Sequence, residues 1–240
     1  GVSSAASDVY KRQISGWPQA SDISSAAAIV METSTNTVLY SKNADQPLYP
    51  ASAVKIMTCL VALENSSLDE QVTMTATGVS GVTDGGANIS SQLDEVFTME
   101  QCLYAIMVAS ANDIALQIAE HVGGSVDGFV QQMNTRAQEL GCTNTVFTNP
   151  TGLPDDNQHT TAHDMALIMQ AAIQNESFRT IAAATSYTIP ATNKAAARNL
   201  TSKFTMTDTG STGFYEGCIG GKEGYTEASG STLVLSLIHI

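Results

Sequence analysis

The chain has 240 residues, of which 43% are hydrophobic and 14% charged, enough for one substantial globular domain. Acidic residues outnumber basic ones by 23 to 10, which gives a net charge of −13. This balance disfavours nucleic acid or an anionic membrane as partner, because binding to phosphate requires a basic face. No apolar run approaches the ~20 residues of a membrane-spanning helix, and the first residues lack the apolar core of a signal peptide.

The N-terminal part of the chain is predicted to form a β-hairpin followed by a helix. Residues 27–41 hold two β-rich runs around a Ser-Thr-Asn turn. A helix is expected at Ser52, because Pro50 suits a first helical turn. A short strand is expected from Gln71, and the glycine-rich stretch 81–87 is expected to be a loop.

The middle of the chain is predicted to be helical and the last third β-rich. Thr98 and Gln101 match a capping box ahead of an apolar stripe, a second stripe ends at Gly141, and Thr161 suits the start of another helix. β-like runs follow at 186–190, 200–206 and 231–237. Strands at both ends with helices between them predict one α+β domain whose terminal strands share a sheet.

Ser52 and Lys55 form an S-x-x-K pair in an apolar helical stretch. Residues three apart lie on the same face of a helix, so both side chains project together. A lysine desolvated by apolar neighbours has a lowered pKa and can take the proton that a serine nucleophile must lose. The alternative is a surface lysine whose stem lies along the helix while its amine reaches water.

Two further short patterns follow downstream. Ser110 and Asn112 suit a turn between two helices with both side chains in one cleft, or simple capping of the second helix. Lys222 and Gly224 precede a late strand, where the missing side chain of Gly224 would let an extended peptide lie close. The alternative for this pair is a glycine-rich turn that enters a strand.

The ordered set S-x-x-K, S-x-N and K-x-G resembles the penicillin-binding and serine β-lactamase superfamily. The stretches 27–64, 98–125, 140–169 and 220–234 are similar to the D-alanyl-D-alanine carboxypeptidases, the low-molecular-weight penicillin-binding proteins of the serine peptidase type. The resemblance implies a β-lactamase/transpeptidase-like α+β fold. In it an antiparallel sheet is built from both chain ends and joined to a mainly helical subdomain.

The resemblance also implies roles for the motif residues. Ser52 would be the acylated nucleophile and Lys55 its general base. Ser110 would relay protons to the leaving group, Asn112 would hold the substrate amide, and Lys222 would tune Ser110. These five residues would form the core of a serine peptidase site.

The strand after Lys222 would bind the substrate through Glu223, Gly224 and Tyr225. The backbone N–H groups of Ser52 and Tyr225 would form the oxyanion hole. The implied substrate is a peptidoglycan stem peptide ending in D-Ala-D-Ala, with β-lactam antibiotics as covalent inhibitors and an extracytoplasmic location. No metal or cofactor is implied, and the four widely spaced cysteines disfavour zinc. His159 lies in a family-like stretch, where a loop or supporting role is the alternative.

The chain departs from the family pattern at three places. Glu223 stands where members carry threonine in K-T-G, which affects the contact with the terminal carboxylate of the substrate. Residues 1–13 and 236–240 do not follow the pattern, and we expect them to be non-family sequence flanking a catalytic domain at 14–235. We expect that domain to be C-terminally incomplete and to lack a membrane anchor.

Three other functions compete with the carboxypeptidase. A D,D-endopeptidase, which cuts cross-links, could tolerate a different carboxylate environment at Glu223. A catalytically weak wall-binding or penicillin-binding module is another alternative, again because of Glu223. A β-lactamase is disfavoured, because residues 149–164 contain no Glu-x-x-Leu-Asn to activate a deacylating water.

Overall fold

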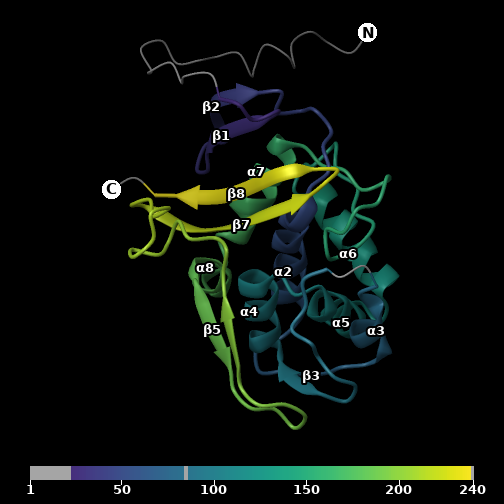
Figure 1. The fold of residues 1–240 in the computed structure, drawn as a ribbon. Helices are drawn as coiled ribbons and strands as arrows, with labels where there is room; N and C mark the ends of the chain where they lie inside the picture. The colour runs from purple at the N-terminus through teal and green to yellow at the C-terminus, as the bar shows by residue number, and fades with distance from the viewer. Residues whose placement is uncertain (1–22, 84–85, 239–240) are drawn as a thin grey trace.

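The computed structural model describes residues 23–83 and 86–238 (Figure 1). The first half holds β1 (Ala28–Glu32), β2 (Thr37–Lys42), the 3-10 turn η1 (Ala51–Ala53), α2 (Val54–Asn65), β3 (Gln71–Thr73), α3 (Ala76–Gly81), β4 (Val96–Thr98) and α4 (Met99–Ala109). The second half holds α5 (Asn112–Gly123), α6 (Val126–Glu139), α7 (Ala162–Ala172), α8 (Glu176–Ala183), β5 (Ser186–Ile189), β6 (Arg198–Thr201), β7 (Cys218–Thr226) and β8 (Gly230–Leu237). The prediction for residues 1–13 lies outside the described residues.

Helix α2 lies at the centre of the hydrophobic core. Its residues from Val54 to Ala62 are all buried, and it contacts α4, α5, α6, α7 and α8. A helix that is apolar on every side must be enclosed, which is why the other helices surround it. Each large apolar side chain buried there stabilises the fold by about 1.5–3 kcal/mol. The start of α2 is thereby held rigidly, and η1 stands directly before it.

The predicted α+β class is confirmed, with one difference in how the strands pair. Within the described residues each strand pairs antiparallel with one partner, in the order β1–β2, β3–β4, β5–β6 and β7–β8. The hairpins from the two ends of the chain both pack on α7, and Figure 1 shows β1–β2 above β7–β8, but they are not hydrogen-bonded into one sheet. Each of these two hairpins completes its pairing across its own short turn.

The local predictions hold best where a helix start has a side-chain signature. The capping box exists, because the N–H of Gln101 donates to the Thr98 hydroxyl and the N–H of Thr98 donates to the Gln101 amide oxygen, at 3.2 and 3.0 Å. The predicted strand 200–206 is wrong beyond Thr201, because the chain turns there and buries Phe204 against Gly221.

Among the described residues no helix has the length and apolar character needed to cross a bilayer.

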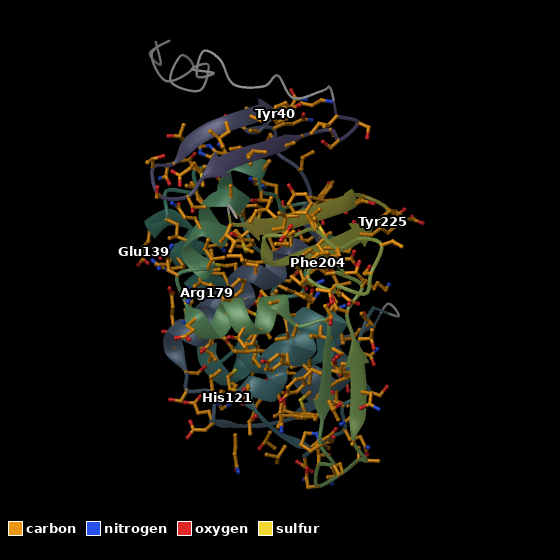
Figure 2. All side chains as sticks on the ribbon, turned by 90° about the vertical axis from the view of Figure 1, so that its left-hand side faces the viewer. Tyr40, His121, Glu139, Arg179, Phe204 and Tyr225 are labelled. Atoms are coloured by element: carbon orange, nitrogen blue, oxygen red, sulfur yellow. The ribbon has the colours of Figure 1, made fainter. Side chains whose placement is uncertain are left out.

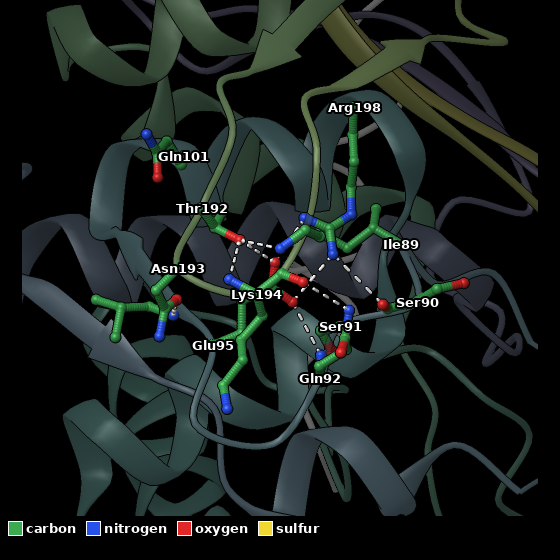
Figure 3. Close-up of polar contacts among 12 residues, drawn as sticks. Ile89, Ser90, Ser91, Gln92, Glu95, Gln101, Thr192, Asn193, Lys194 and Arg198 are labelled. Atoms are coloured by element: carbon green, nitrogen blue, oxygen red, sulfur yellow. Dashed lines mark hydrogen bonds and ion pairs between the residues drawn. The ribbon is translucent and has the colours of Figure 1, made fainter.

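The β5–β6 hairpin is fastened to the helical region by a buried ion pair (Figure 3). Arg198 at the start of β6 donates to both carboxylate oxygens of Glu95, at 2.7 and 3.0 Å. Thr192 in the hairpin loop also donates to this carboxylate, at 2.6 Å, and the guanidinium lies 5.5 Å from the Phe97 ring centre. The loop around Glu95 is thus tied to a hairpin about one hundred residues later in the chain.

Candidate active site

Ser52 lies in the 3-10 turn η1, one turn before the regular helix α2. Its neighbours Ala51 and Ala53 are buried, while Ser52 itself stays partly accessible. Ala51 has φ of +49°, a left-handed conformation that costs a non-glycine residue on the order of 1–2 kcal/mol. The turn therefore holds the Ser52 hydroxyl at the mouth of the site at some cost in backbone strain.

Lys55 lies next to Ser52, inside the protein. Its side chain is 1% exposed, and its Nζ is 3.4 Å from the Ser52 Oγ. The same nitrogen donates to the Asn112 Oδ1 at 2.7 Å and to the Thr151 carbonyl oxygen. Burial, and after it the positive charge of Lys222, holds the pKa of Lys55 well below its usual value. The surface-lysine alternative is thus excluded by burial.

Ser110 and Asn112 stand at the junction of α4 and α5, as predicted. Ser110 ends α4 with φ of +54° and donates its hydroxyl to the Ser52 Oγ at 3.1 Å. Asn112 opens α5, and its backbone N–H donates to the Ala87 carbonyl oxygen at 2.8 Å while its side chain contacts Lys55. One sharp turn therefore brings both side chains to the Ser52–Lys55 pair.

Strand β7 closes the site from the other side. Lys222 is 5% exposed, and its Nζ donates to the Glu223 carbonyl oxygen at 2.7 Å. Burial lowers the pKa of Lys222 to about 8, although the Glu223 carboxylate acts in the opposite direction. A Cβ added to Gly224 would lie 2.7 Å from the backbone nitrogen of Ser52. Gly224 is therefore needed so that the strand can approach Ser52 closely.

Glu223 and Tyr225 alternate with the residues that face the site. Glu223 pairs with Leu233, which is 54% exposed, and side chains directly opposite each other in a sheet share a face. Tyr225 is 69% exposed and lies at the outer side of the hairpin (Figure 2). The Glu223 side chain is thus on the face of β7 opposite Lys222 and Gly224. Arg198 does not pair with Glu223, because its guanidinium binds Glu95 at 2.7 Å.

The motifs did not reveal a turn at Asn149–Gly152 that contacts both reactive residues. Thr151 provides the carbonyl acceptor for Lys55, and Gly152 packs against the Ala51–Ser52 backbone. A backbone carbonyl has no sequence signature, although the Asn-Pro-Thr-Gly string does indicate a turn. His159 forms an antiparallel backbone bridge with Val146, in keeping with its loop alternative.

The arrangement suits nucleophilic catalysis. A neutral Lys55 amine can accept the proton of the Ser52 hydroxyl, while Ser110 supplies a hydrogen bond to the same oxygen. Within residues 23–83 and 86–238, no group of three or more His, Cys, Asp or Glu side chains is placed to hold a metal ion. Cys59, the buried thiol nearest Lys55, has its pKa raised by burial to about 12, so it stays protonated.

The chain is similar to known peptidases over most of its length. The D-alanyl-D-alanine carboxypeptidase family of peptidases matches residues 15–239. The D-alanyl-D-alanine carboxypeptidase DacF of Bacillus subtilis is 38% identical over 155 residues, which are 63% of this chain and 39% of that protein. A D-alanyl-D-alanine endopeptidase of Escherichia coli is 30% identical over 154 residues, 64% of this chain and 49% of that protein. The chain therefore matches only two fifths to one half of the length of these relatives.

The solved structures agree in fold over most of the chain. The crystal structure of a D-alanyl-D-alanine carboxypeptidase from Mycobacterium tuberculosis has a TM-score of 0.83 and 29% identity. The match covers 94% of this chain and 82% of that one.

Proposed function

Because the chain belongs to the D-alanyl-D-alanine carboxypeptidase family, we propose that it is a serine D,D-carboxypeptidase. It removes the terminal D-alanine from peptidoglycan stem peptides through an acyl-enzyme on Ser52. The observation that carries this proposal is the Lys55 amine, buried 3.4 Å from the Ser52 hydroxyl with a pKa well below its usual value. A lowered pKa raises the neutral fraction of this amine, and the neutral amine can act as the general base that a serine nucleophile needs.

The proposed reaction has two halves. The Ser52 Oγ attacks the carbonyl carbon of the penultimate D-alanine, and its proton passes to the Lys55 Nζ. The peptide C–N bond then breaks, the leaving D-alanine nitrogen receives a proton through Ser110, and an ester remains on Ser52. Water hydrolyses this ester and returns the hydroxyl. The backbone N–H groups of Ser52 and Tyr225 stabilise the oxyanion in both halves.

The remaining site residues hold the substrate. Asn112 binds its amide, and Gly224 lets the peptide backbone lie beside β7. Lys222 tunes the Ser110 hydroxyl for its role as proton relay. β-Lactams acylate the same serine, and the protein works outside the cytoplasm on the cell wall. The relative named as an endopeptidase, together with Glu223, supports a D,D-endopeptidase acting on cross-linked peptides as the second candidate.

Penicillin labelling and peptide turnover together test this function. Intact-mass analysis after incubation with penicillin should show one adduct, mapped to Ser52 and absent from Ser52→Ala. Lys55→Arg should slow acylation by about 10²–10⁴-fold, because arginine keeps the charge but cannot release its proton. Lys194→Arg, a change at an exposed lysine, is the matched control.

Release of D-alanine from a peptide ending in D-Ala-D-Ala then separates an enzyme from a module that only binds penicillin. Cleavage of a cross-linked dimer in place of the monomeric peptide would favour the endopeptidase. An adduct on another residue, or normal acylation of Lys55→Arg, would contradict the assignment of Ser52 and Lys55.

A further inference from the structure

The turn at Asn149–Gly152 is organised by the side chain of Asn149, which Gln158 supports from behind. Gln158 accepts from the Asn149 N–H at 3.2 Å and donates to the Asn149 Oδ1 at 3.3 Å. The Oδ1 of Asn149 accepts three hydrogen bonds from within the turn: from the Thr151 N–H at 3.2 Å, the Thr151 hydroxyl at 3.0 Å and the Gly152 N–H at 2.8 Å. The Nδ2 of Asn149 donates to the Leu153 carbonyl oxygen at 3.0 Å. The Asn149 amide therefore fixes the backbone on both sides of Thr151.

This turn is also docked on the helix that carries the reactive residues. The Pro150 carbonyl oxygen accepts a hydrogen bond from the hydroxyl of Thr58, one turn after Lys55 on α2, at 2.8 Å. Gly152 has φ of +83°, and a Cβ there would lie 2.0 Å from the Ala51 carbonyl oxygen. The turn is thus packed directly against the backbone that presents Ser52.

The position of this turn affects the orientation of the Lys55 amine, because the amine forms a limited number of hydrogen bonds. A neutral amine has two N–H donors and one lone pair. In the neutral form that the proposed mechanism requires, the Asn112 Oδ1 and the Thr151 carbonyl oxygen take the two donors of Lys55. The lone pair is then left for the third neighbour, the Ser52 hydroxyl, 3.4 Å away. If the Thr151 carbonyl shifted, the amine could rotate and direct an N–H at Ser52 instead.

We propose that Asn149 is a positioning residue: by fixing the Thr151 carbonyl, it orients the Lys55 amine so that its lone pair faces the Ser52 hydroxyl. Asn149 acts through the backbone and does not touch the reacting atoms. The inference rests on the proposed function, since it assigns a support to the same general base.

The test compares two asparagines that each fasten a loop. Asn134 on α6 clamps Phe147 through both backbone groups, at 2.8 Å each, two residues before Asn149. Asn134→Ala therefore removes a similar structural clamp from the same segment, but not one bonded to the turn under Lys55. Wild type, Asn134→Ala, Asn149→Ala and Asn149→Ser are compared. For each we measure the melting temperature first. The acylation rate constant at saturating fluorescent penicillin and the half-saturating concentration are then measured well below the lowest of these melting temperatures.

Asn149→Ala is expected to lower the acylation rate constant by about 10–100-fold, the scale of an ångström-sized misplacement, with the half-saturating concentration unchanged. Asn134→Ala should lose melting temperature but keep the wild-type rate constant. Asn149→Ser should fall between Ala and wild type, because a serine hydroxyl supports such a turn more weakly; this milder change also keeps the comparison usable if Asn149→Ala folds poorly.

Two results would overturn the inference. One is a wild-type rate constant in Asn149→Ala. The other is an equal loss of rate in Asn134→Ala at an equal loss of melting temperature, which would mean general destabilisation. Absence of a Ser52 adduct in the wild-type protein is a distinct result, because it would contradict the proposed function itself and this support with it.

Discussion

Two lysines, Lys55 and Lys222, are buried within one site. The free energy that this burial costs follows, for Lys222, from the change in its pKa. Burial lowers its pKa from 10.5 to about 8. Between these values the unfolded chain binds the proton and the folded chain does not, so this residue makes stability rise with pH across that window. Below pH 8 the penalty is complete, and a shift of this size corresponds to about 3 kcal/mol. The site thus holds Lys222 at the expense of stability.

Lys222→Met should therefore stabilise the protein at pH 7, by up to about 3 kcal/mol in unfolding free energy, while abolishing penicillin acylation. The gain should shrink as the pH rises from 8 toward 10.5, because the folded wild-type protein then holds the lysine neutral, and above pH 10.5 the lysine is neutral in both states. Urea unfolding at pH 7 and pH 10 measures it, with the exposed Lys194→Met as the control that shows no such gain. An equal gain at both pH values would mean that the lysine charge is not its cause.

At the scale of the element, β7 shows why K-E-G can replace K-T-G. Strand alternation sends Lys222 and Gly224 toward the site and Glu223 to the face it shares with the exposed Leu233. If the proposed peptide binds along the face of Lys222 and Gly224, a carboxylate on the opposite face does not meet its terminal carboxylate at contact distance. The repulsion that the sequence alone would predict, about 4 kcal/mol for like charges 4 Å apart at an effective dielectric of 20, is therefore avoided.

Glu223→Thr should change the turnover of a D-Ala-D-Ala peptide and of a cross-linked dimer by less than about 2.5-fold, the factor that corresponds to the roughly ±0.5 kcal/mol of an ordinary surface substitution. The neighbouring Gly224→Ala should abolish both, because its Cβ would lie 2.7 Å from the Ser52 backbone nitrogen. Thermal melts of the two variants separate loss of activity from loss of folding. If Glu223→Thr raised carboxypeptidase turnover and lowered dimer cleavage, Glu223 would instead be a specificity switch toward endopeptidase substrates.

How far the elements and the site could be predicted depends on whether side chains or backbone define them. The capping box at Thr98 and the junction at Ser110 have side-chain signatures, and both were placed from the sequence. Short elements such as α3 and β4 have no sustained periodicity and were missed. One acceptor for Lys55 is the Thr151 carbonyl, which any residue could supply, so it becomes apparent only in the folded structure.

At the scale of the whole molecule, distant parts of the chain meet around Glu95 (Figure 3). Burial raises the pKa of this carboxylate, but the hydrogen bonds from Arg198, Thr192 and the Gln92 N–H outweigh burial and hold its pKa below the usual value. The loop that carries Glu95 continues back to Ala87, whose carbonyl binds the Asn112 N–H in the site. The ion pair therefore joins the β5–β6 hairpin to a segment that borders the candidate active site at Asn112.

Arg198→Met should destabilise the protein by about 3–5 kcal/mol, because it leaves the Glu95 carboxylate, 0% exposed, buried without its partner. The loss should diminish as the pH falls, since the stranded carboxylate can then take a proton. The double variant Glu95→Gln/Arg198→Met should be less destabilised than Arg198→Met alone, because no charge remains buried. Arg136→Met removes two surface ion pairs, with Glu64 at 2.9 Å and with Glu139 at 3.1 Å, and should cost only about 1–2 kcal/mol. Urea unfolding of these variants, with Glu95→Gln alone included, measures the unfolding free energies at pH 5 and pH 7. If the loss in the double variant equals the sum of the two single losses, the two side chains are not coupled and the pair does not link the hairpin to the site.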